Sequence, residues 1–167
     1  MVNLDEKANL LEQQISDERQ KLSADRMDIS FGEIMNLYEQ SELIIRPEYQ
    51  RLFRWTNTQK TLLIESILMG IPIPPIFVAE DEDGIWELVD GLQRVSTIIS
   101  FFGKLNSDLV QKHEVSDVVE DLVSNSNNWE LEAGDIFKDL EGFDVNTLPQ
   151  KYKLNIKRAV CRVEILR

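Results

Sequence analysis

The sequence contains one cysteine, Cys161, and one histidine, His113. A single cysteine forms no internal disulfide, and two such ligands cannot complete a structural zinc site. The apolar stretch between residues 67 and 78 is interrupted by Gly70 and by three prolines, so no run reaches the roughly 20 residues that a membrane-spanning helix needs. The first residues carry acids and no apolar signal region. We therefore expect a cytoplasmic protein with no membrane partner.

Basic residues are also scarce, with 18 Lys and Arg against 30 Asp and Glu, which gives a net charge of −12. This balance argues against extended contact with the DNA backbone. The acids concentrate in residues 108–145, where 11 acids face 2 bases. One basic group, Arg46, Arg51, Arg54 and Lys60, lies within the acidic chain and favours a small anionic ligand such as a nucleotide. Pairing of these bases with surface acids is the alternative.

The length of 167 residues fits one domain with an added arm. Apolar residues at Leu4, Ala8, Leu11 and Ile15 follow a heptad-like spacing and predict a helical arm over residues 1–27. Such a short helix needs a partner, which is either its own domain or the arm of a second copy in a homodimer. Residues 28–167 then form the domain, with a polar, acidic insertion at about 108–145.

Periodicity and turn residues predict the elements of this domain. Helices are expected at 31–39, 59–69, 92–102, 116–123 and after Pro149, and strands at 28–30, 43–45, 76–79, 85–89 and 159–166. We predict that Ser30 and Thr58 cap two helices and that Gly70 ends the second one. Helices and strands alternate without a regular βαβ repeat, which favours an α+β fold with a small mixed sheet. The predicted main core is Leu62 and Ile67 against Val95, Ile98 and Phe102.

Acidic residues also fill the loop between two predicted strands, at 80–84. Its turn-forming residues predict a hairpin. A calcium loop is the alternative, but the ligand spacing of an EF-hand and its distal Glu are missing.

The most informative segment runs from Leu88 to Arg94, where an apolar strand ends in Asp90 and Gly91 opens a helix. Helix N-termini expose unpaired N–H groups and attract phosphates. Arg94 lies in the first turn, where the helix dipole disfavours a cation, so an anionic partner is expected. Either a bound phosphate supplies the anion and leaves Asp90 free for a metal or water, or Asp90 itself pairs with Arg94.

Three blocks of sequence, PEYQRLFRW, LIESILMGIPIPPIFV and WELVDGLQRVSTIISFF, resemble the N-terminal domain of GmrSD-type restriction proteins. The resemblance covers residues 28–103. It implies a ParB/sulfiredoxin-like core that binds a nucleoside triphosphate (GTP, ATP or UTP), with Mg²⁺ as a further ligand. In some members of this family the nucleotide is hydrolysed, and the domain acts with a nuclease on modified or foreign DNA.

The family motif is written D-G-Q-Q-R, and this chain has Asp90, Gly91, Leu92, Gln93 and Arg94 in its place. The resemblance implies that Asp90 is the catalytic and metal-binding residue. It also implies that the nucleotide contacts Gly91, Gln93 and Arg94, together with a Q-R pair at Gln50 and Arg51. We expect Gln50, Arg51, Asp90, Gly91 and Arg94 to meet in one cleft, and Leu92 to point inward. If the missing glutamine orients water, this chain binds nucleotide without hydrolysing it.

The sequence has no run of histidines and asparagines that could form an HNH nuclease. We therefore expect the nuclease to be a further domain or subunit, and DNA to be contacted only through that larger assembly. Two alternatives stay open at this point. The domain can be a non-catalytic sensor of the same family, or a ParB-like domain that acts directly on DNA, which the charge disfavours.

Overall fold

The computed structural model describes residues 3–21, 24–46, 55–105 and 126–167. The described helices are α1 (Leu4–Lys21), α2 (Phe31–Glu39), α3 (Asn57–Met69), α4 (Leu92–Phe101), the 3-10 helix η1 (Lys138–Leu140) and α7 (Gln150–Arg158). The strands are β1 (Ala24–Ser30), β2 (Leu43–Ile44), β3 (Ile76–Glu80), β4 (Trp86–Asp90) and β5 (Val160–Leu166). The predicted helix at 116–123 lies outside these ranges.

The strands form one mixed sheet in the order β1-β5-β3-β4-β2. The outer pairs differ in direction, since β1 is antiparallel to β5 and β2 is parallel to β4. In the centre, β3 is antiparallel to β4 and parallel to β5, the last strand of the chain. The predicted α+β class with a small mixed sheet is therefore confirmed.

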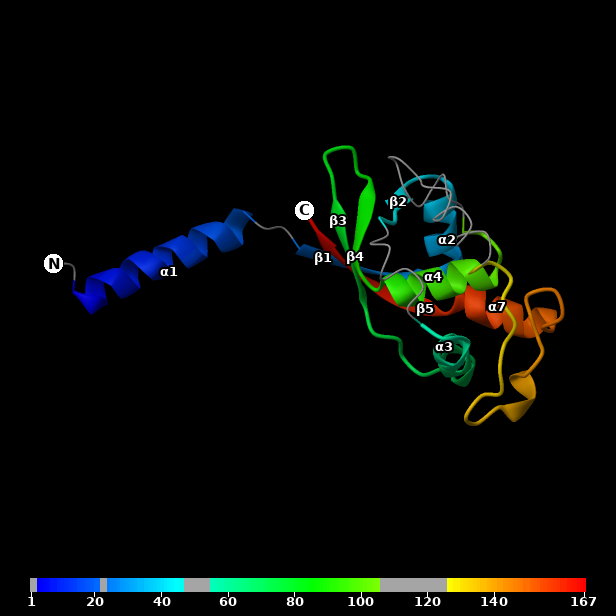
Figure 1. Ribbon diagram of the computed structural model, residues 1–167. Helices are drawn as coiled ribbons and strands as arrows, with labels where there is room; N and C mark the ends of the chain where they lie inside the picture. The colour runs from blue at the N-terminus through cyan, green and yellow to red at the C-terminus, as the bar shows by residue number, and fades with distance from the viewer. Residues whose placement is uncertain (1–2, 22–23, 47–54, 106–125) are drawn as a thin grey trace.

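Helices α2, α4 and α7 lie together against the sheet, and α3 packs beside α4 and α7 (Figure 1). Their apolar sides close over the inward residues of β3 and β5. The buried side chains of this core include Phe31, Ile34, Tyr38, Ile64, Ile67, Ile76, Val78, Val95, Ile98, Ile99, Ile156, Cys161 and Val163. Cys161 occupies the inner face of β5 as a small apolar residue.

Helix α1 contributes nothing to this core, because every one of its residues is exposed. It projects away from the sheet at the end where β1 begins (Figure 1). Of the two partners expected for the arm, its own domain therefore provides no packing surface among the described residues, and the arm of a second copy stays a prediction. No helix in the described ranges combines the length and the apolar character needed to cross a membrane.

Capping residues set the ends of the core helices. The Ser30 hydroxyl accepts a hydrogen bond from the Glu33 N–H at 3.1 Å, as predicted for the start of α2. The predicted Thr58 cap of α3 is wrong. The helix starts two residues earlier, with a capping box formed by Thr56 and Gln59. Gly70 ends α3 in the left-handed region at φ 79°, as expected.

The predicted core residues are correct for Ile67, Val95 and Ile98, which are buried. Leu62 and Phe102 are only half-buried, and their neighbours Leu63 and Phe101 take the buried positions. On α3, Leu62 lines a surface groove beside Arg94, as described below.

Residues 126–145 also differ from expectation, because this part of the predicted insertion packs into the domain. Trp129, Leu131 and Leu140 are buried. The Trp129 ring meets Phe101 edge to face with centroids 5.4 Å apart, and its Nε1 donates to the Ser100 hydroxyl at 3.1 Å. The prediction was wrong because it rested on the acidic composition of this stretch and not on its three buried apolar residues.

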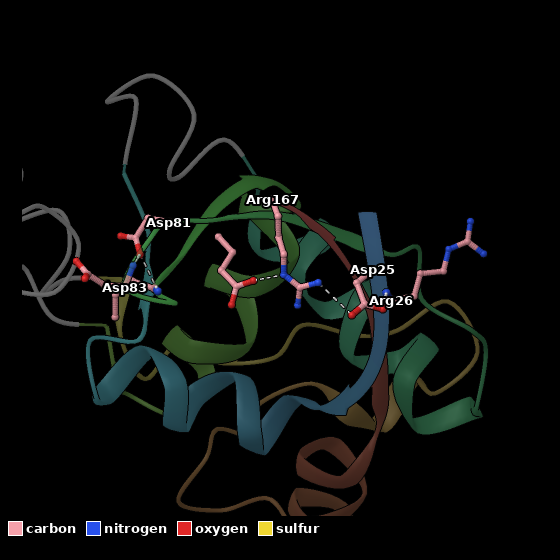
Figure 2. A network of polar contacts seen from close by, with 7 residues as sticks. Asp25, Arg26, Asp81, Asp83 and Arg167 are labelled. Carbon is pink, nitrogen blue, oxygen red and sulfur yellow. Dashed lines mark hydrogen bonds and ion pairs between the residues drawn. The ribbon is translucent and has the colours of Figure 1, made fainter. Parts of the chain in front are cut away.

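The strand at 28–30 is also longer than predicted, because β1 begins at Ala24. Polar side chains join it to neighbouring strands near the end of β5. Arg167 donates through Nε to Glu80 on β3 and through Nη1 to Asp25 on β1 at 3.2 Å (Figure 2). The carboxylate of Asp25 also accepts from the Arg26 N–H at 2.8 Å. This contact and then Arg167 lower the pKa of Asp25 from its ordinary value.

The lowered pKa predicts how stability depends on pH at this strand end. A carboxyl with a lower pKa in the folded state stabilises the fold above its unfolded pKa of roughly 4, and this contribution is lost as the pH falls further. We therefore expect the stability difference between wild type and Asp25→Asn to shrink between about pH 5 and pH 2. Urea unfolding at several pH values measures it. A difference that is constant with pH would contradict the assignment. The effect should be small, because Asp25 is solvent-exposed.

The hairpin between β3 and β4 is also polar at its tip. The Asp81 carboxylate accepts from the backbone N–H groups of Asp83 and Ile85, each at 2.9 Å (Figure 2). The Asp81 carboxylate therefore stabilises the turn through these two bonds. Since β3 and β4 are antiparallel, the hairpin prediction is confirmed.

Candidate functional site

The segment from Asp90 to Arg94 forms the turn between β4 and α4. Gly91 is the N-cap of the helix, with φ 102° and no side chain to cap the first turn. A Cβ at this position would lie 2.6 Å from Cγ2 of Ile76. Only glycine combines this backbone conformation with this contact, so Gly91 is required for the fold itself.

The guanidinium of Arg94 folds back against the start of β3. Its Nη2 donates to the carbonyl of Pro75 at 2.8 Å, whereas its Nε is buried with no hydrogen-bond partner. Among the described residues Arg94 makes no ion pair with Asp90. The interpretation of these two residues as an internal salt bridge is therefore wrong.

Asp90 ends β4 opposite Phe77 of β3, beside a bulge, and its side chain is exposed. No described residue bonds to its carboxylate. Within the described ranges no three His, Cys, Asp or Glu side chains gather closely enough to hold a metal ion. Asp90 can therefore offer a metal a single carboxylate, with the other ligands left to water and to a bound anion.

The remaining positions of the motif differ in role. Leu92 is half-buried against the core, as predicted for a residue that points inward. Gln93 accepts through Oε1 a hydrogen bond from the backbone N–H of Trp55 at 3.3 Å. This bond fixes the start of the chain leading into α3 beside the first turn of α4.

Gln50 and Arg51 lie outside the described residues, so their convergence on this turn stays a prediction. Of the described residues on either side of them, one contacts the turn and the other contacts β4 before it. Before them, β2 runs parallel to β4 toward the Asp90 end, and Arg46 pairs with Glu87 at 2.8 Å. After them, Trp55 contacts Gln93.

A groove of about 480 Å³ opens beside Arg94, between α3 and the segment that follows it. Its walls are mostly apolar, and Arg94 is the charged residue that lines it. The lining residues are Trp55, Gln59, Leu62, Leu63, Ser66, Ile71, Pro72, Ile73, Pro74 and Arg94. The half-buried Leu62 therefore faces this groove and not the main core.

A second polar site, on another side of α3, was not predicted from the sequence. The Glu65 side chain is 4% exposed and accepts from the N–H groups of Asp135, Ile136 and Phe137 at 3.2, 3.1 and 2.8 Å. One turn earlier, the Thr61 hydroxyl accepts from the Glu132 N–H at 3.0 Å. Threonine and glutamate four residues apart within an apolar helix were the only available signal.

Together these features define a small α+β domain with a strand–glycine–helix turn that presents a carboxylate and an arginine. A family model described as the GmrSD restriction endonuclease, N-terminal domain, matches residues 31–165. The match spans well over half of the chain, so the chain belongs to this family of restriction-defence domains. No curated protein and no solved structure matches it. The ParB/sulfiredoxin-like description of the core thus stays a prediction.

Proposed function

We propose that this domain binds a nucleoside triphosphate at the Asp90–Arg94 turn and regulates a restriction nuclease through that binding. The observation that carries the proposal is the Arg94 guanidinium, whose buried Nε has no hydrogen-bond partner. A buried charged group without a full set of partners is costly unless an anion completes its contacts.

The backbone of the turn supports the same conclusion. The first helical hydrogen bond of α4 runs from the Val95 N–H to the Gly91 carbonyl. The N–H groups of Leu92, Gln93 and Arg94 precede it and have no partner within the helix. With Gly91 as N-cap, no side chain caps the first turn through a hydrogen bond, and Nη2 of Arg94 lies close to Gly91. Phosphate oxygens can accept from such groups and interact favourably with the positive end of the helix dipole.

The groove beside Arg94 suits the rest of a nucleotide. Its apolar walls, among them Trp55 and Pro72, offer surface to a flat base, while Arg94 holds the phosphates at one end. Gln50 and Arg51 complete the site in this proposal, which is supported by the contact of Trp55, four residues after Arg51, with Gln93 of the turn. Arg51 would add a second cation for the phosphates.

Asp90 is the residue that would hold Mg²⁺. Mg²⁺ commonly binds proteins through one or two carboxylates together with phosphates and water, and a single exposed carboxylate fits that pattern. When bound, Mg²⁺ supplies charge neutralisation at the phosphates. Asp90 can also orient a water molecule. Leu92 packs on the core and can orient none, so the proposed activity is nucleotide binding, with hydrolysis slow or absent.

The nuclease and the DNA belong to the same proposal as partners in a larger assembly. The outer face of the sheet carries both charges in pairs, such as Arg26 with Glu164 and Arg162 with Asp28, which offers DNA no continuous basic surface. Direct action on DNA by this domain is therefore the weaker alternative.

The decisive measurement is the shift in melting temperature that each NTP causes, with and without Mg²⁺. For Arg94→Ala we expect nucleotide affinity to fall about tenfold to a hundredfold, because a charge-assisted contact of roughly 1.5–3 kcal/mol is lost. Arg162→Ala is the matched control. It removes an arginine from an exposed ion pair on the outer sheet face and should leave affinity unchanged.

Asp90→Asn separates binding from hydrolysis. It removes a negative charge near the phosphates, so affinity without Mg²⁺ should hold or rise while the benefit of Mg²⁺ and any phosphate release decrease. Gly91→Ala is a poor probe, because its contact with Ile76 would disturb folding directly. If wild-type protein gains no stability from any NTP under either condition, the isolated domain does not bind nucleotide and the proposal is wrong.

A further inference from the structure

Helix α1 is the largest part of the described chain with no partner. Its apolar side chains lie in water, with exposed fractions of 82% for Leu4, 54% for Leu11 and 43% for Ile15. A helix of 18 residues has little stability alone, and burial of an apolar stripe is what stabilises most helices of this length. A surface of this kind marks an interaction site.

The spacing of the stripe defines a single heptad register. Steps of four, three and four residues place Leu4 and Leu11 at d positions and Ala8 and Ile15 at a positions. Leucine at d with a β-branched residue at a favours parallel two-stranded coiled coils, and the layer of Leu11 and Ile15 has this combination, whereas Ala8 at the other a position is small and unbranched. The register therefore points to a second helix of the same kind.

The charged residues beside the apolar stripe favour a parallel over an antiparallel orientation of the two α1 helices. Lys7 occupies a g position and Glu12 the next e position, and in a parallel dimer these two residues face each other across the seam on both sides. In an antiparallel dimer with the same apolar layers, Asp5 would face Glu12 at both ends. Neither Lys7 nor Glu12 is in an ion pair with any described residue, so both are available.

We propose that two copies of this chain associate through a parallel coiled coil of their α1 helices. The partner is thus a second copy, with Leu4, Ala8, Leu11 and Ile15 as the buried seam. The seam spans less than two heptads, because Glu18 occupies the next d position, so the dimer is weak and reversible and its population depends on concentration. The inference does not depend on nucleotide binding.

Sedimentation equilibrium of the whole chain over a range of concentrations tests the proposal. Leu11→Ser should raise the dimer dissociation constant about tenfold or more, because a leucine from each copy loses its burial. Leu10→Ser is the matched control. Leu10 is on the same helix and is 59% exposed, but its c position lies off the seam, so the dimer should persist. An unchanged melting temperature would show that the domain remains folded.

Two further variants test the orientation. Lys7→Glu should weaken the dimer, and Lys7→Glu combined with Glu12→Lys should restore it. Ala8→Cys should form an intermolecular disulfide under mild oxidation, because a positions face each other only in the parallel arrangement; the buried Cys161 does not compete. A monomer at the highest soluble concentration, equal sensitivity to Leu10→Ser and Leu11→Ser, or no disulfide would each overturn the proposal.

Discussion

Glu65→Ala should lower the free energy of unfolding by about 3–5 kcal/mol, because it leaves three backbone N–H groups without an acceptor inside the protein. The carboxylate bonds to Asp135, Ile136 and Phe137, and it is the main polar link between α3 and the segment after Trp129. Thermal or urea unfolding measures the loss. Tryptophan fluorescence from Trp129 would report whether that segment detaches before the sheet unfolds.

A graded series separates this role from a general effect of removing a glutamate. Glu65→Gln keeps the shape and one acceptor oxygen, so its cost should be smaller than that of Glu65→Ala. Glu33→Ala removes an exposed helical glutamate and should cost less than about 1 kcal/mol. If Glu65→Ala is no more destabilising than Glu33→Ala, the carboxylate does not hold the segment and the assignment is wrong.

Ile98→Ala should cost roughly 2–5 kcal/mol, the usual range when a fully buried isoleucine is truncated. Ile98 is 1% exposed at the centre of the face of α4 that meets the other core helices and the sheet. Since small domains have about 5–15 kcal/mol in total, this single change would consume a large part of the stability.

Ile136→Ala is the control for that prediction. Its side chain is 62% exposed, so the same chemical change should alter the melting temperature little. Equal costs at Ile98 and Ile136 would show that α4 packs through a different face. The comparison needs only unfolding curves, and it does not depend on what the domain binds.

The sequence was sufficient to predict elements whose signals are local. Helix α2 has a serine cap and apolar residues at helical spacing, and α4 follows a glycine turn with a single apolar side, so both were placed within one residue of their ends. The hairpin before α4 was also correct, because its turn residues lie between two clear strands. Each of these signals lies within a dozen residues.

Helix α3 shows why other features were not predictable. It is covered on one side by the core and on another by residues 131–137, which are about seventy positions away in the sequence. Burial of Thr61 and Glu65 depends on that distant segment, and nothing near them in the sequence indicates it. Leu62 was assigned to the wrong face because it lines the groove beside Arg94.

The candidate site was predicted in part. The sequence indicated that Arg94, in the first turn of a helix, needs an anionic partner. In the structure Asp90 is not that partner, because the two residues form no ion pair. The bond from Arg94 to the Pro75 carbonyl was not foreseeable, because it depends on how β3 begins. The positions of Gln50 and Arg51 stay a prediction.

The position of β5 has a consequence for synthesis of the chain. This strand is made after the other four described strands, yet it lies between β1 and β3 in the sheet, with Ala24 opposite Leu166. A ribosome-bound chain shorter than residue 160 therefore holds two strands with open edges and no partner between them. Sheets joined by such distant contacts form slowly, and open edges recruit other chains. The domain should consequently be most vulnerable to aggregation before its final strand leaves the exit tunnel.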